Sequence, residues 1–134
     1  MQQFIEIIST VVEITEQNFV LYQGDTLTFN LAFKKDDGTA EDITGWTILF
    51  TAKKSKELAD TDDGVIAKDG VLDADPTTGL ATVSLATADI GDCLGVYFYG
   101  IKYVDDETEP NIKTVLEGRI TFLKNTTQRI APLE

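Results

Sequence analysis

The sequence predicts an all-β protein, an immunoglobulin-like β-sandwich of about seven antiparallel strands. Short runs of β-branched and aromatic residues recur along the chain, and clusters of Gly, Asp, Asn and Pro separate them. Several of these runs alternate apolar and polar residues, which is typical of strands with one buried face. The length of 134 residues is that of one domain with one hydrophobic core.

The clearest strand covers residues 26–33, where apolar residues alternate with small or polar ones. One face of this strand is therefore expected to be buried and the other exposed. A shorter apolar run at residues 19–22 precedes it, and the pair Asp37-Gly38 that follows predicts a hairpin turn. The apolar face consists of Leu27, Phe29, Leu31 and Phe33.

Further strands are expected at residues 46–52, 80–85, 95–104 and 112–123. In the last of these, Gly118 indicates a bulge or a close approach of another backbone segment. The side chains expected in the core are Leu27, Phe29, Leu31, Trp46, Ile48, Phe50, Tyr97 and Phe122.

Two shorter elements are expected between these strands. Asp69-Gly70 separates two short apolar pieces, which predicts a small hairpin that turns at this pair. Residues 87–91 predict one short helical turn, with Thr87 as its N-cap and Gly91 as its stop.

The chain divides into an N-terminal segment (residues 1–16), a sandwich domain (17–124) and a C-terminal tail (125–134). The β-branched content of the first segment favours a strand, although some of its apolar positions also fit one face of a helix. Such an apolar segment is not expected to stay in water. It packs either on its own domain, as an extra strand, or on a neighbouring subunit, as an interaction arm. The side chains of that arm are Phe4, Ile5, Ile7, Ile8, Val11 and Val12.

The composition excludes several functions. There are 23 acidic and 11 basic residues and no His, giving a net charge of −12. Binding to nucleic acid or to an anionic membrane requires clustered Lys and Arg, so we expect neither partner. Without His, no Ser–His or Cys–His pair can form, and the lone Cys93 cannot build a thiolate zinc site. We expect no catalytic residue, no cofactor and no secretory signal, and the chain is not expected to be an enzyme.

Aspartates crowd two turns in the middle of the chain, which superficially resemble a calcium loop. They lack the ligand spacing of an EF-hand, and Asp and Gly are also the common residues of exposed turns. We expect solvated turns, with a weak calcium site as the alternative. Its ligands would be Asp60, Asp62, Asp63, Asp73 and Asp75.

The aromatic strand at residues 95–104 has two interpretations. Tyr97, Tyr99 and Tyr103 share one face, and packing in the core is the default for such side chains. The same rings on the surface would be typical of a carbohydrate-binding adhesin module.

Two parts of the chain together resemble a known family. The first part contains QGDTLTFNL (23–31), DDGT (36–39) and DITGWTI (42–48), and the second contains GVYFYGI (95–101), an acidic turn and VLEGRITF (115–122). This order of strands and turns is similar to that in the N-terminal domain of siphophage upper baseplate proteins, over residues 19–124. Those proteins usually continue into a longer part, whereas this chain stops at Glu134.

The resemblance implies a phage virion structural protein, assembled in the host cytoplasm and localised to the virion. It would be a tail or baseplate subunit that assembles in multiple copies through its sandwich edges and terminal arms. Its partners would be copies of itself and other virion structural proteins. A capsid decoration or head-associated protein of similar fold is the alternative. The shared motifs contain no catalytic residue.

Overall fold

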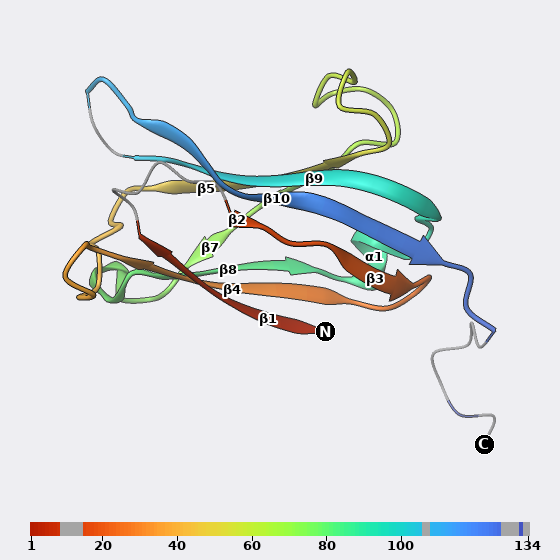
Figure 1. Cartoon of the computed structure of the whole chain (residues 1–134), viewed down its shortest axis with the longest axis horizontal. Coiled ribbons are helices and arrows are strands. Elements are labelled where there is room, and N and C mark those ends of the chain that lie inside the picture. Colours follow the sequence, from red (N-terminus) through yellow and green to blue (C-terminus); the bar gives the residue numbers. More distant parts are fainter. Residues whose placement is uncertain (9–14, 106–107, 127–131, 133–134) are drawn as a thin grey trace.

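The computed structural model describes residues 1–8, 15–105, 108–126 and 132. They form a sandwich of two β-sheets, seen as an upper and a lower layer in Figure 1. The all-β sandwich predicted from the sequence is confirmed. The described strands are β1 (Gln2–Ile8), β2 (Thr15–Glu16), β3 (Phe19–Tyr22), β4 (Leu27–Lys34), β5 (Thr47–Lys53), β6 (Ile66–Asp69), β7 (Val71–Leu72), β8 (Leu80–Leu85), β9 (Gly95–Val104) and β10 (Ile112–Leu123).

The strand order is β1-β4-β8-β7 in the first sheet, here called sheet A. In the second sheet, sheet B, the order is β2-β10-β9-β5-β6, and β3 also pairs with β10. The prediction of antiparallel strands throughout is wrong at the edges. Strand β1 runs parallel to β4, and β2 and β3 run parallel to β10, while the other pairs are antiparallel. Parallel pairing is possible here because long stretches of chain connect the paired strands.

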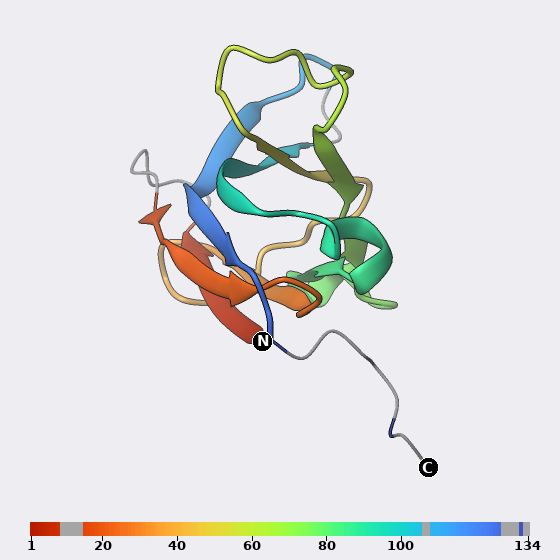
Figure 2. The same ribbon diagram turned by 90° about the vertical axis from the view of Figure 1, so that its right-hand side faces the viewer.

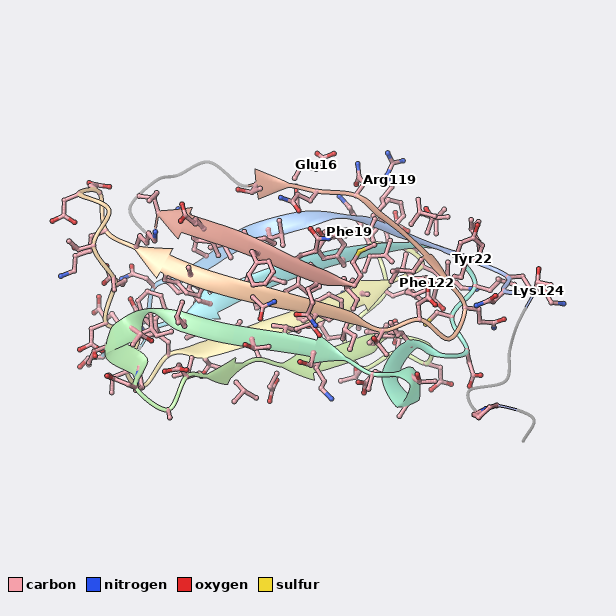
Figure 3. All side chains as sticks on the ribbon, turned by 90° about the horizontal axis from the view of Figure 1, so that it is seen from below. Glu16, Phe19, Tyr22, Arg119, Phe122 and Lys124 are labelled. Atoms are coloured by element: carbon pink, nitrogen blue, oxygen red, sulfur yellow. The ribbon has the colours of Figure 1, made fainter. Side chains whose placement is uncertain are left out.

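The described residues of the N-terminal segment contain strands β1 and β2, as its β-branched residues favoured. Strand β1 lies at one edge of sheet A, and β2 and β3 lie at one edge of sheet B. The chain therefore changes sheets between β1 and β2. In Figure 3, β1 lies beside β4 in front of sheet B.

The hairpin predicted at Asp69-Gly70 is wrong. Strand β6 pairs with β5 in sheet B, whereas β7 pairs with β8 in sheet A, so the chain crosses between the sheets at Gly70. The crossing is tight: a Cβ atom on Gly70 would lie 2.7 Å from the Cβ of Ile48. The Asp37-Gly38 turn does fold back, but it leads only to a single bridge between Lys34 and Ala40 before the chain enters sheet B.

Seven of the eight predicted core side chains are buried, and Trp46 is half-buried. Trp46 packs against the core by stacking on Tyr103, with 4.4 Å between the ring centroids. Tyr97, Tyr99 and Tyr103 are all at most 7% exposed, so their rings belong to the core. The strand therefore offers no tyrosine platform for sugars, and the adhesin interpretation loses its binding surface.

The predicted helical turn is present as α1 (Thr87–Ile90), which carries the chain from sheet A to sheet B (Figure 2). Its N-cap position is Ala86, not Thr87 as predicted. The carboxylate of Asp89 accepts a hydrogen bond of 2.8 Å from the backbone N–H of Ala86, which stabilises the start of the turn. One further turn of 3₁₀-helix covers Pro76–Thr78.

The structure of β10 decides whether Gly118 marks a bulge or a close backbone approach. The bulge lies between Thr114 and Leu116, where it turns both Val115 and Leu116 into the core. Gly118 instead marks a close backbone approach, because a Cβ atom there would overlap the carbonyl oxygen of Gln17. The absent side chain thus lets the segment before β3 lie directly on β10.

Candidate interaction surfaces

The structure divides the predicted interaction arm. Ile5 and Ile7 are 5% and 6% exposed, so within this chain they belong to the core and not to an arm that lies free. Ile8 is half-buried, whereas Phe4 is 80% exposed. Val11 and Val12 lie outside the described residues. Of the predicted arm, Phe4 is the described apolar side chain that faces solvent.

Strand β1 presents one edge of its backbone to the outside. The carbonyl of Met1 accepts a hydrogen bond from the N–H of Thr28, and backbone groups alternate in direction along a strand. The backbone groups of Gln2, Phe4 and Glu6 therefore point away from β4. No other strand among the described residues pairs with this side of β1. Such an edge is a template for pairing with another chain.

A broad groove lies on the outer face of sheet A, with a volume of about 790 Å³. Three exposed apolar side chains border it: Phe4 (80% exposed), Val71 (70%) and Leu80 (45%). Its floor is formed by small and polar side chains, which include Ala32, Asn30 and Thr82. At one end of the groove, Lys34 on β4 and Glu6 on β1 form an ion pair with 2.7 Å between the ammonium and the carboxylate. We call this surface the sheet-A groove.

A second hollow lies on the outer face of sheet B, with a volume of about 230 Å³. It surrounds Gly100, which stands opposite Thr51 on β5 and Glu117 on β10. Since glycine has no side chain, the sheet surface is open at this point. We call this hollow the Gly100 depression; its lining includes Leu49, Thr51, Phe98, Lys102 and Thr114.

Lysines border the Gly100 depression. Lys53 pairs with Asp60 at 2.7 Å and also donates a hydrogen bond to the carbonyl of Leu58. The ammonium of Lys56 lies 5.6 Å from the centroid of the Phe98 ring, a cation–π contact. Lys102 is half-buried and also lines the depression. The border therefore holds three lysines and the carboxylate of Asp60, and a second acidic residue, Glu117, stands opposite Gly100 in the ladder.

The edge formed by β2, β3 and β10 is polar at its centre. In Figure 3, Glu16 and Arg119 project outward from this edge, whereas Phe19 lies between the sheets. Asn18 accepts a hydrogen bond of 2.9 Å from the backbone N–H of Arg119 through its side-chain oxygen. These contacts fix the edge without leaving a deep cavity, since the hollow there is only about 160 Å³.

Exposed apolar side chains also gather near the end of β10 on the outer face of sheet B. The ladder places Thr121 between Val20 and Val96, and it pairs Leu123 with Tyr22. The four apolar members are 41–58% exposed. This patch adds to the apolar surface of a sheet face that already holds the Gly100 depression.

The structure does not bring the five calcium candidates together. Asp60 pairs with Lys53, and hydrogen bonding to that ammonium lowers the pKa of its carboxyl. Asp62 accepts from the backbone N–H of Ala59, and Asp75 caps the 3₁₀-helix. Among the residues that the structure describes, no group of three or more acidic or Cys side chains could hold a metal ion.

Cys93 is buried beside Tyr97. Burial raises the pKa of the Cys93 thiol, which favours the unreactive protonated form. Burial and the contact with Cys93 raise the pKa of Tyr97 to about 12. This pair therefore packs and hydrogen-bonds within the core. In the part of the chain that is described, no helix has the length and apolar character needed to span a membrane.

Sequence reasoning did not identify the Gly100 depression. One feature of the sequence pointed to it: Gly100 interrupts an aromatic strand and has no turn beside it. It was also a weak signal, since the depression depends on side chains from three different strands.

Comparison with known proteins gives a match only at the level of structure. Neither protein-family models nor curated proteins match this sequence. Among solved structures, the N-terminal domain of ORF48 of phage TP901-1 is similar, with a TM-score of 0.54 and 13% identity over 92% of this chain and 98% of that one. Auracyanin A, a blue copper protein from Chloroflexus aurantiacus, has a TM-score of 0.41 and 17% identity over 91% and 99% of the two chains. The first match confirms, for the fold, the resemblance to a phage N-terminal sandwich domain.

Proposed function

We propose that this chain is a structural protein of a phage virion, a tail or baseplate subunit that assembles in multiple copies. The observation that carries the proposal is the fold shared with the N-terminal domain of a phage protein over 92% of the chain. The sequence resemblance to upper baseplate proteins, which lies in the order of strands and turns, supports the same role. Its partners would be copies of itself and other virion proteins.

The surface features of the described residues are better suited to contact with another subunit than to catalysis. Among the described residues, no group of three or more acidic or Cys side chains could hold a metal ion, and the titratable side chains around the Gly100 depression are mainly lysines. By contrast, the open edge of β1, Phe4 and the sheet-A groove are features that an adjoining subunit can cover. Adding a strand to a sheet edge satisfies backbone groups and gives affinity with little side-chain chemistry.

Immunogold electron microscopy of phage particles from cells that carry this gene tests the proposal. Antibodies raised against the purified chain are expected to label the tail tip. Labelling of the head instead would favour a capsid decoration or head-associated protein. If neither intact nor disrupted particles bind the antibody, and mass spectrometry of the particles finds no peptide of the chain, a virion role is wrong.

A further inference from the structure

Strand β1 is the longest open sheet edge among the described strands. It has seven residues, and its register with β4 runs from Gln2 to Ile8 without a shift. The strands at the other sheet edges are short: β2 and β7 have two residues each, and β3 and β6 have four. Proteins protect their sheet edges with short strands, Pro, Lys or bulges. None of these devices occurs in β1, so its row of backbone groups is open to another strand.

The hydrogen-bonding pattern of this edge restricts what can cover it. The backbone groups of Gln2, Phe4 and Glu6 point away from β4, so the occupant must be an extended strand that aligns with all three. The longer described strands β4, β5, β8, β9 and β10 already have neighbours on both sides. The strand of a second copy that is both open and long enough is therefore β1 itself.

Strand β1 is complementary to itself in the antiparallel orientation. With a two-fold axis at Phe4, the N–H of each Phe4 donates to the C=O of the other, and Gln2 of one copy stands opposite Glu6 of the second copy. No carboxylate then faces another carboxylate. The two Phe4 rings, each 80% exposed in the single chain, become neighbours on the outer face, where cross-strand aromatic pairs stabilise a sheet.

The edge is close to neutral in a chain whose net charge is −12. Glu6 is the one charged side chain of β1, and the ammonium of Lys34 lies 2.7 Å from its carboxylate. The edge of sheet B on the same side of the molecule presents Glu16 and Arg119, one of each sign (Figures 2 and 3). Attraction here comes from backbone hydrogen bonds and from burial of Phe4, and local charge does not oppose it.

We infer that two copies of this chain pair through β1, antiparallel and centred on Phe4, so that their two A sheets become one continuous sheet. The inference rests on the proposed multi-copy assembly and names one contact within it. The two sheet-A grooves then meet at the pair of Phe4 rings, because Phe4 borders each groove. A two-fold contact of this kind occupies both open edges and closes at a dimer.

Sedimentation velocity of the full chain over a range of concentrations tests the pairing, and the wild type is expected to form dimers. Phe4→Pro removes an N–H that points outward and none that bonds to β4, and Pro is tolerated on edge strands. Because the two-fold axis repeats the change, association is expected to weaken by at least about tenfold.

Val20→Pro is the matched control for this change. The N–H of Val20 on β3 likewise points away from its neighbour β10, because Gln17 and Gln23 donate toward β10 and the direction alternates along the strand. This variant should associate as the wild type does. Melting temperatures show that each variant is folded.

Cysteine cross-linking tests the register. Directly opposed residues of a hydrogen-bonded antiparallel pair have Cα atoms about 5.5 Å apart, within the roughly 4.4–6.8 Å that a disulfide spans. An equimolar mixture of Gln2→Cys and Glu6→Cys is therefore expected to form a linked heterodimer on mild oxidation. Each variant alone should stay unlinked, as should the wild type, whose Cys93 is buried. Val71→Cys, at the other edge of sheet A, mixed with Glu6→Cys is the control for random collisions.

Three results would overturn the inference: a monomeric wild type, a folded Phe4→Pro variant that dimerises as the wild type does, or a Gln2→Cys and Glu6→Cys mixture that links no more than its controls. None of these results would affect antibody labelling of particles. Failure of this contact is therefore distinguishable from failure of the proposed virion role.

Discussion

Phe29 shows how a single residue joins the two sheets. Its side chain is fully buried, and its ring centroid lies 5.6 Å from those of Phe19 and Tyr99 and 5.9 Å from that of Phe50. Phe29→Ala leaves a cavity among these rings and is expected to lower the free energy of unfolding by about 3–5 kcal/mol. Urea denaturation measures the loss. The control Phe4→Ala should stay within about 0.5 kcal/mol of the wild type, and a loss below about 1 kcal/mol for Phe29→Ala would contradict this packing.

Tyr97 makes stability depend on pH in the alkaline range. Its pKa is raised from 10.0 to about 12 in the folded chain. Between these values the unfolded state has lost the phenol proton and the folded state has kept it, so the free energy of unfolding falls as pH rises. Below this range the stabilisation is complete.

The variant Tyr97→Phe removes one contribution to this fall. Urea denaturation at a series of pH values from neutral upward should show a shallower decline for the variant than for the wild type. Tyr99, Tyr103 and Cys93, whose pKa values are also raised by burial, contribute to the slope that remains. Identical slopes in the two proteins would mean that the Tyr97 phenol titrates alike in the folded and unfolded states.

Two glycines of sheet B have opposite roles in their strands. A side chain at Gly118 on β10 would overlap the carbonyl oxygen of Gln17, whereas one at Gly100 on β9 meets no close neighbour. Gly118→Ala is therefore expected to cost at least about 1–3 kcal/mol, because the segment before β3 must move off β10. Gly100→Ala should instead stabilise the chain by about 0.5–1 kcal/mol, since glycine weakens a strand interior. Thermal or urea unfolding of both variants measures whether each change lowers or raises the free energy of unfolding. Equal effects of the two changes would refute the assignment.

Strand β1 is part of the sandwich as well as a surface for contact. Removing residues 1–8 takes away the edge strand of sheet A and with it the buried side chains of Ile5 and Ile7. Two such side chains contribute about 3–6 kcal/mol, which is a large part of the roughly 5–15 kcal/mol that stabilises a typical domain. The truncated chain is expected to unfold at much lower urea concentration than the wild type. If it unfolds at the same concentration, β1 does not belong to the core.

For the molecule as a whole, net charge and exposed surfaces together govern how copies of the chain associate. A net charge of −12 makes like copies repel at long range, and salt screens this repulsion. Assembly then requires local surfaces that are apolar or of opposite charge. The exposed Phe4 and the apolar side chains that border the sheet-A groove form such a surface.

The local alternation of the sequence was sufficient to identify the sandwich and most of its core. In the strand that contains Leu27, Phe29 and Leu31, the side chains that alternate in sequence are the ones that are buried, because successive residues of a strand face opposite sides. The acidic composition and the absence of His likewise excluded nucleic-acid binding and imidazole chemistry without a structure.

Which strands pair, and in which direction, was decided by the tertiary structure alone. Alternation is the same for parallel and antiparallel neighbours, so it could not reveal that β1 runs parallel to β4 or that β3 runs parallel to β10. The Asp69-Gly70 pair has the composition of a hairpin turn, yet it crosses between sheets because β6 and β7 find different partners. The contact between Asn18 and Arg119 joins residues 101 positions apart. Such contacts, like the depression around Gly100, depend on several distant segments at once, and no local pattern in the chain encodes them.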